Sequence, residues 1–189
     1  MSRIKRGAAS DCENFAMGTE IELKLVCPPA VLARVARHPA VRALKTGRAR
    51  SERLVSRHFD TPDGALRSAG LALHVRRTAR GWVQTLRGEG ANTAGLQTRP
   101  EWNWPVGADA IEPAPLLDTP AAKALGGRKK FSALLETLVP VFESDFLHTT
   151  HPLQFPCGTR AELCVDIGEV RAGNRSEPVY EAEIELLPQ

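Results

Sequence analysis

Polar and apolar residues alternate strictly near the start of the chain, over residues 18–25. Successive side chains of an extended strand point to opposite faces, so this pattern predicts a strand with one apolar and one charged face. The charged face consists of Glu20, Glu22 and Lys24. Residues two positions apart lie ~7 Å apart along a strand, so the two carboxylates can converge on one hard cation such as Mg²⁺. The alternative is a half-buried strand whose charged face meets water.

Patterns along the rest of the chain predict a mainly antiparallel β protein with a few helices. Strands are expected over residues 52–60, 71–78, 82–86, 97–106, 141–150, 160–166, 169–172 and 180–187. Helices are expected within residues 28–44 and over residues 128–139, and a loop is expected over residues 88–95. Because proline donates no backbone hydrogen bond, Pro100 favours an edge position for its strand, or a bulge. So many short strands indicate a β-sandwich or a closed barrel.

The polar faces of these strands carry charges of both signs. Their titratable residues include His74, Arg76, Arg87, Arg99, Glu101, Asp166, Glu181, Glu183 and Glu185. Like charges at period two repel each other, so cationic neighbours or a bound metal ion must compensate them. Faces that point outward would make an ordinary sandwich with a charged surface. Faces that point inward would line a barrel lumen with charge, which requires pairing or ligands and suits a strongly anionic substrate held by metal.

Composition limits the partners that this chain can have. The 189 residues fit one domain, and 42% of them are apolar, which suffices for a sizeable core. A net charge of +3 is too small to indicate nucleic-acid binding, and no apolar run approaches the ~20 residues of a membrane span. The four cysteines show no metal-binding spacing, so we expect reduced thiols and a cytoplasmic location. Residues 1–16 lack apolar periodicity, which predicts a disordered leader before a domain at 17–189.

The ordered motifs resemble the CYTH superfamily, the triphosphate tunnel metalloenzymes. The Glu-Ile-Glu-Leu-Lys run at residues 20–24 is similar to the ExExK signature of that family. Further similar segments follow in order at residues 59–63, 73–76, 85–87, 99–101, 142–146, 165–169 and 181–186. The resemblance covers residue 17 to the end, and it is closest to the bacterial inorganic triphosphatases.

This resemblance implies an α+β, mainly β fold: a closed eight-stranded antiparallel barrel with a few outer helices. It implies metal-dependent hydrolysis of inorganic triphosphate to diphosphate and phosphate, with Mg²⁺ or Mn²⁺ as cofactor. The residues that it implies as catalytic are Glu20, Glu22 and Lys24. Those implied to bind phosphate are Lys24, Arg76, Arg87, Arg99, His74 and His148. Those implied to bind metal are Glu20, Glu22, Glu101, Asp166, Glu183 and Glu185.

The chain departs from the family pattern at three of these positions. Relatives usually carry arginine where this chain has His74 and near His148, and lysine where it has Arg87. Neutral histidines weaken phosphate binding, so hydrolysis of thiamine triphosphate or nucleotide triphosphates, adenylate cyclase-type chemistry, and a non-catalytic module that binds polyphosphate or nucleotide remain alternatives. The expected partner is a small anionic triphosphate, with no nucleic acid and no membrane, and a homodimer is left open.

Overall fold

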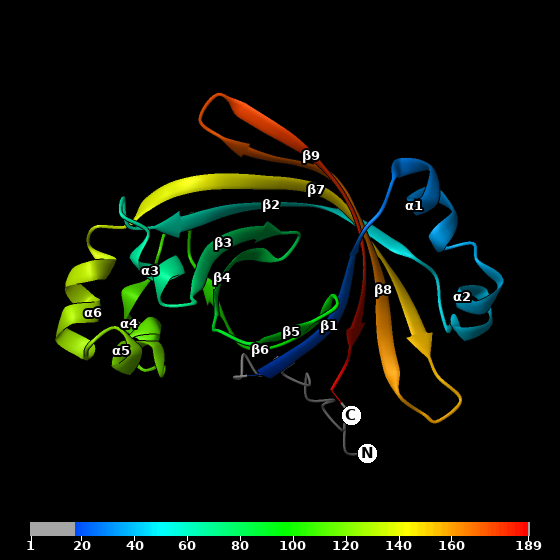
Figure 1. The fold of residues 1–189 in the computed structure, drawn as a ribbon, viewed down its shortest axis with the longest axis horizontal. Helices are drawn as coiled ribbons and strands as arrows, with labels where there is room; N and C mark the ends of the chain where they lie inside the picture. The colour runs from blue at the N-terminus through cyan, green and yellow to red at the C-terminus, as the bar shows by residue number, and fades with distance from the viewer. Residues whose placement is uncertain (1–17, 189) are drawn as a thin grey trace, which may run out of the picture.

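The computed structural model describes residues 18–188, so the leader expected at residues 1–16 lies outside the described part. Eight antiparallel strands form a ring in the order β1-β9-β8-β7-β2-β3-β4-β6, and β6 pairs back onto β1 (Figure 1). A short ninth strand, β5, pairs with β6. The strands are β1 Gly18–Val26, β2 Arg50–Asp60, β3 Ala72–Thr78, β4 Gly81–Arg87, β5 Ala91–Thr93, β6 Leu96–Val106, β7 Val139–Gln154, β8 Arg160–Ala172 and β9 Arg175–Leu186. The prediction of a closed eight-stranded antiparallel barrel is therefore confirmed.

Six short helices lie outside this ring (Figure 1). They are α1 Pro29–Val35, α2 Pro39–Leu44, α3 Ala65–Ser68, α4 Pro113–Leu116, α5 Ala121–Ala124 and α6 Arg128–Leu135. Helices α1 and α2 lie on one side of the barrel and α3–α6 on the other. Within residues 18–188, no helix is long and apolar enough to cross a membrane.

The hydrophobic cores lie between these helices and the outer faces of the strands. One core surrounds the fully buried Phe131 of α6 and includes Leu66 of α3 and Leu86 of β4. A smaller core places Leu32 of α1 against β7, β8 and β9, where it meets Leu163.

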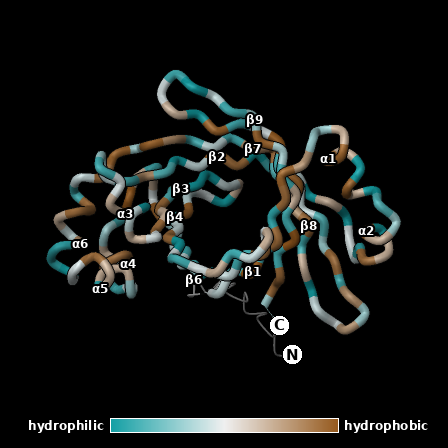
Figure 2. Tube along the Cα trace, viewed as in Figure 1, coloured by the Kyte–Doolittle hydropathy of each residue, from teal (hydrophilic) through white to brown (hydrophobic). Residues whose placement is uncertain are grey.

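Hydrophilic and hydrophobic residues follow one another in short steps along the strands (Figure 2). The helices thus cover many of the apolar side chains that alternate outward, whereas Leu147 and Ile167 stay exposed. The opposite strand faces point into the lumen, and they are mostly polar.

The prediction of two strands over residues 160–172 is wrong, because β8 runs through this range without interruption. Gly168 suggested a turn in the sequence, but it lies in the middle of the strand. A Cβ atom at this position would lie 2.0 Å from the carbonyl oxygen of Asp145 on β7. Glycine therefore serves here to let two backbones approach closely.

The edge position inferred from Pro100 is also wrong, since β6 has neighbours on both sides. In an antiparallel strand, the N–H and C=O of one residue point to the same side. The Pro100 carbonyl accepts a hydrogen bond from the Gly88 N–H, just beyond the last residue of β4. The missing donor of Pro100 therefore faces a loop rather than the paired part of β4.

Two further boundaries differ from the prediction. Three residues of the loop expected at 88–95 form β5, and the helix expected to reach residue 139 ends at Leu135.

Candidate active site

The charged strand faces point into the barrel, where they line a cavity of about 290 Å³. Most of the residues predicted for the site lie on its walls: Glu20, Glu22, Lys24, Arg76, Arg87, His148, Asp166, Glu183 and Glu185. The inward arrangement is the one that the sequence left open beside an ordinary sandwich. The closed ring gives each strand one face toward the lumen and one face toward the outside. The charged faces are the ones that line the lumen, so the barrel is observed and the sandwich with a charged surface is not.

The cavity has an acidic wall and a basic wall. The acidic wall comes from β8 and β9 and consists of Glu162, Asp166, Glu181, Glu183 and Glu185. The basic wall consists of Arg76 on β3 and Arg87 on β4, which line the cavity, and of Arg99 on β6, which lies just behind the lining and pairs with Glu20. Strand β1 lies between β6 and β9, so its own charged face bridges the two walls.

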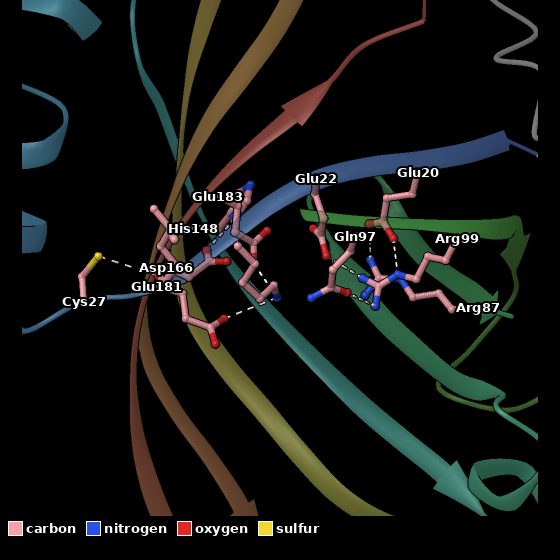
Figure 3. A network of polar contacts seen from close by, with 12 residues as sticks. Glu20, Glu22, Cys27, Arg87, Gln97, Arg99, His148, Asp166, Glu181 and Glu183 are labelled. Atoms are coloured by element: carbon pink, nitrogen blue, oxygen red, sulfur yellow. Dashed lines mark hydrogen bonds and ion pairs between the residues drawn. The ribbon is translucent and has the colours of Figure 1, made fainter. Parts of the chain in front are cut away.

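The basic wall holds the β1 carboxylates in ion pairs (Figure 3). Arg99 donates from Nε to Glu20 Oε2 at 2.5 Å and from Nη2 to Glu22 Oε1 at 2.7 Å. Arg87 donates from Nη2 to Glu20 Oε1 at 2.9 Å and from Nε to Glu101 Oε2 at 2.5 Å. Both oxygens of Glu20 are thus bound by arginine. Arg99 and Glu101 lie outside the lining of the cavity but hold residues that line it.

Lys24 connects β1 to the acidic wall. Its Nζ lies 2.5 Å from Glu183 Oε1 and 3.5 Å from Glu181 Oε2. Burial lowers the pKa of Lys24, but the carboxylates of Glu183 and Glu181 outweigh it, so the pKa is raised above the usual value. The ammonium group therefore stays charged, and it sits where an anion bound in the cavity would meet it.

The acidic wall carries more negative charge than its neighbours balance. Glu22, Glu185 and Glu162 lie directly opposite one another on β1, β9 and β8. Burial, followed by the carboxylates of Glu20, Glu101 and Glu22, raises the pKa of Glu185 to about 7. Burial and the carboxylates of Glu183 and Glu20 likewise raise the pKa of Glu22. Directly opposed like charges destabilise a sheet, so this wall favours a bound cation.

The donor chemistry of the lumen fits a hard divalent cation, since carboxylate oxygens are the ligands that Mg²⁺ and Mn²⁺ prefer. Across residues 18–188, however, no three acidic, histidine or cysteine side chains are grouped as a ready metal site. The ion pairs explain this difference, because Glu20 and Glu22 are held by arginine and Glu183 by Lys24. A metal would have to replace these cationic partners.

Arg76 differs from the other lumen cations. Its Nε donates to Ser56 Oγ at 3.1 Å, and no carboxylate of the described part of the chain lies within ion-pair distance. Burial and the positive charge of Arg87 lower the pKa of Arg76. This guanidinium therefore faces the cavity with hydrogen-bond donors to spare.

The two predicted phosphate-binding histidines have different surroundings. His148 lines the cavity, and its Nδ1 lies 2.6 Å from Asp166 Oδ1 on the neighbouring strand. Burial lowers its pKa, but Asp166 outweighs this effect and the pKa is raised, which favours the imidazolium. His74 is 2% exposed, lies outside the lining of the cavity, and has a buried Nε2 without a hydrogen bond. Burial and then Arg76 lower the pKa of His74 well below its usual value, so this ring is neutral.

Some lining residues were not predicted as site residues. They are Leu54, Ser56, His58, Phe142, Ser144, Phe146, Glu162, Cys164, Val170, Val179 and Glu181. Strand β2 supplies Ser56 and His58, whose spacing of two residues is the same signal that identified β1. The sequence offered no cue to which face of β2 points inward, because charged and polar residues occur on both of its faces.

Comparison with known proteins agrees with this geometry. The CYTH domain profile matches residues 18–188. An inorganic triphosphatase from Haemophilus influenzae is 30% identical over 168 residues, which cover 88% of this chain and 45% of that protein. The chain thus spans less than half the length of this relative. The structure of a candidate adenylate cyclase from Bacillus halodurans has a TM-score of 0.54 at 20% identity, covering 89% of this chain and 81% of the other, which shows a similar fold.

Proposed function

The chain belongs to the CYTH domain family, and from that premise we propose that it hydrolyses inorganic triphosphate to diphosphate and phosphate with the help of a divalent metal ion. Triphosphatases of this family depend on a metal, and the 30% identical relative is an inorganic triphosphatase. That relative is more than twice as long as the matched segment, so the activity is carried to this chain as a proposal. The lumen supplies independent support.

Arg76 is the observation that carries the proposal. Lys24, Arg87 and Arg99 each contact a carboxylate, whereas Arg76 hydrogen-bonds only to the hydroxyl of Ser56 in the described structure. A guanidinium withdrawn from water costs free energy unless an anion pairs with it. Phosphate oxygens match the guanidinium donors in charge and geometry. An anion that reaches the cavity therefore gains most at Arg76.

The two walls suggest how the site works. Lys24, Arg76, Arg87 and His148 line the cavity and would bind phosphate oxygens. Arg99 would join them when substrate frees it from Glu20 and Glu22. We leave out His74 because it is 2% exposed and does not line the cavity. Residues that would hold Mg²⁺ or Mn²⁺ are Glu20, Glu22, Glu101, Asp166, Glu183 and Glu185. A bound metal neutralises charge on the phosphate oxygens. Substrate would release Glu20 from its two arginines, and a water oriented by a lumen carboxylate would attack the terminal phosphorus. Positioning and charge neutralisation would supply the rate gain.

Phosphate release from tripolyphosphate, thiamine triphosphate and ATP, with Mg²⁺ or Mn²⁺ and with a chelator, tests this proposal. We expect metal-dependent release that is fastest from tripolyphosphate. Arg76→Gln should raise KM for tripolyphosphate about tenfold or more, because a charge-assisted hydrogen bond contributes ~1.5–3 kcal/mol. Arg53→Gln is the matched control, since Arg53 pairs with Asp145 and its side chain is 73% exposed.

No release from tripolyphosphate with either metal, or release unaffected by the chelator, would contradict the proposal. Binding without release would favour the non-catalytic module. Faster release from thiamine triphosphate or ATP would favour the organic substrates.

We also propose a cytoplasmic location, which the unpaired Cys27, Cys157 and Cys164 support. The lack of nucleic-acid and membrane partners and the homodimer stay predictions.

A further inference from the structure

A second cavity of about 460 Å³ is lined by residues from the end of β2, the start of β7 and the segment that leads into α3. These three segments lie together at one end of the barrel (Figure 1). The walls of this cavity include the apolar side chains of Leu71, Leu73 and Val141. Two residues, His58 and Phe142, line both this cavity and the charged lumen. We call the second cavity the side pocket. The two shared residues are thus the boundary between the side pocket and the lumen.

This boundary belongs to a row of three neighbouring rings on three adjacent strands. His58 on β2 lies directly opposite Phe142 on β7 and His74 on β3. The rings of His58 and Phe142 are stacked, with centroids 4.1 Å apart and planes at 15°. The rings of His58 and His74 have centroids 5.0 Å apart. At these distances the rings are in van der Waals contact, so no phosphate group can pass between them as they stand.

The row differs from the rest of the lumen in charge. Burial, followed by the charges of Arg76 and Arg87, lowers the pKa of His58 to about 4. His74 is neutral for the same reasons, and Phe142 has no charge. The row itself therefore offers a phosphate chain no electrostatic attraction. The charged residues beyond it line the side pocket, and they are Arg67, Asp60 and Asp63.

Arg76 occupies the next inward-facing position beside the row. It lies opposite Ser56, and Ser56 and His58 are two residues apart on β2, so Arg76 and the row are separated by one inward step of ~7 Å. A phosphate bound by Arg76 would therefore lie against the rings. Nothing larger than that phosphate could extend past Arg76 toward the side pocket.

We propose that the stacked His58–Phe142 pair closes the lumen beside Arg76, so that a substrate must place an unsubstituted terminal phosphate there. This inference rests on the proposed triphosphatase function and adds a specificity determinant to it. The side pocket lies within the size range of small-molecule sites and has mainly apolar walls. Truncating either ring would join the two cavities and let an organic group on that phosphate enter the side pocket.

Diadenosine 5′,5‴-triphosphate tests this proposal, because both ends of its triphosphate chain are esterified. Its hydrolysis adds one water across a P–O–P bond and yields AMP, ADP and two protons when both products are fully ionised. ATP, which keeps one free terminal phosphate, shows whether an adenosine at the other end is tolerated. We expect the wild type to hydrolyse tripolyphosphate and to leave the diadenosine compound intact.

Phe142→Ala and His58→Ala should raise kcat/KM for diadenosine triphosphate, relative to tripolyphosphate, by about tenfold or more, the scale on which a pocket discriminates a small group. Phe146→Ala is a control that enlarges only the lumen, and Val141→Ala is a control that enlarges only the side pocket. Neither control should change the ratio. Phe142 is 37% exposed and outside both hydrophobic cores, so its truncation should leave the fold intact, and Phe142→Leu with a melting curve checks this.

Two results would overturn the proposal: cleavage of diadenosine triphosphate by the wild type as fast as ATP, or folded His58 and Phe142 variants whose substrate ratio equals that of the wild type. Isothermal calorimetry without metal provides a second measure, in which only the truncated variants should bind the diadenosine compound. If the wild type releases no phosphate from tripolyphosphate, the proposed function fails first, and the inference fails with it.

Discussion

Glu20 has the most heavily paired carboxylate of the lumen, since both of its oxygens accept hydrogen bonds from arginine. Glu20→Gln should reduce metal-supported phosphate release by orders of magnitude. It should also lower the melting temperature of the metal-free protein, because Arg87 and Arg99 each lose an ionic partner.

Glu185 is expected to show the opposite effect on stability, since burial and the neighbouring carboxylates raise its pKa to about 7. Glu185→Gln should raise the metal-free melting temperature at pH 8. Equal shifts of the same sign in the two variants would contradict this account.

His58 provides a pH-dependent test at the same scale. Its pKa is lowered to about 4 by burial, Arg76 and Arg87, while the unfolded chain has the ordinary value near 6.5. Between these values the unfolded state binds more protons, so the free energy of unfolding falls as the pH drops from 6.5 to 4. His58→Phe keeps a ring on Phe142 but cannot be protonated. Melting curves from pH 7 to 4.5 should therefore show a smaller loss of stability in this variant, although Ser144 and the neutral His74, which also face His58, remain in both proteins. Parallel curves would contradict the prediction.

At the scale of one strand, the absence of a Cβ atom at Gly168 allows β8 to pair closely with β7. A Cβ atom there would lie 2.0 Å from the Asp145 carbonyl oxygen and 2.8 Å from the Phe146 Cα atom. Gly168→Ala should therefore force β7 and β8 apart and destabilise the protein by about 1–3 kcal/mol, as overpacking does elsewhere. Gly107→Ala is the control, because a Cβ atom there would meet nothing within 4 Å. Urea unfolding measures both, and equal midpoints would contradict the prediction.

Strands were predictable where their evidence is local. The alternation at residues 18–25 identified β1, and the strands expected over residues 71–78 and 82–86 correspond to the paired strands β3 and β4. The continuity of β8 was not predictable, because the reason for Gly168 is the backbone of β7, more than twenty positions away. The inner position of β6 was missed for a similar reason, since Pro100 is tolerated only because β4 ends beside it.

The strand patterns do not show whether the charged faces point into the barrel or out of it, and only the closed barrel determines this direction. Periodicity grouped Glu20 with Glu22 and placed His74 on the same face as Arg76, and the structure keeps both groupings. It could not predict that His74 lies outside the lining of the cavity, or that Arg76, unlike Lys24, Arg87 and Arg99, has no ion pair with a carboxylate of residues 18–188. Those facts depend on pairs such as His58 with Phe142, which are 84 positions apart (142 − 58). The resemblance in the motifs supplied residue types at the site but not their contacts.

The balance of charge across the lumen leads to a prediction for the whole molecule. Without ligands, Arg87 and Arg99 pair with the β1 carboxylates Glu20 and Glu22, and Lys24 pairs with Glu183 of the acidic wall. A metal ion that binds these carboxylates would release the cations, and a triphosphate that binds the cations would release the carboxylates. Binding of one should therefore strengthen binding of the other, and the coupling must be reciprocal. Ligands that bind only the folded state raise the melting temperature, and the increase grows with the logarithm of ligand concentration over Kd. We expect Mg²⁺ alone and a slowly hydrolysed triphosphate analogue alone to give small shifts, and both together to exceed the sum. Arg76→Gln should reduce the shift from the analogue more than the shift from Mg²⁺. Shifts that merely add would show that the two walls bind their ligands independently.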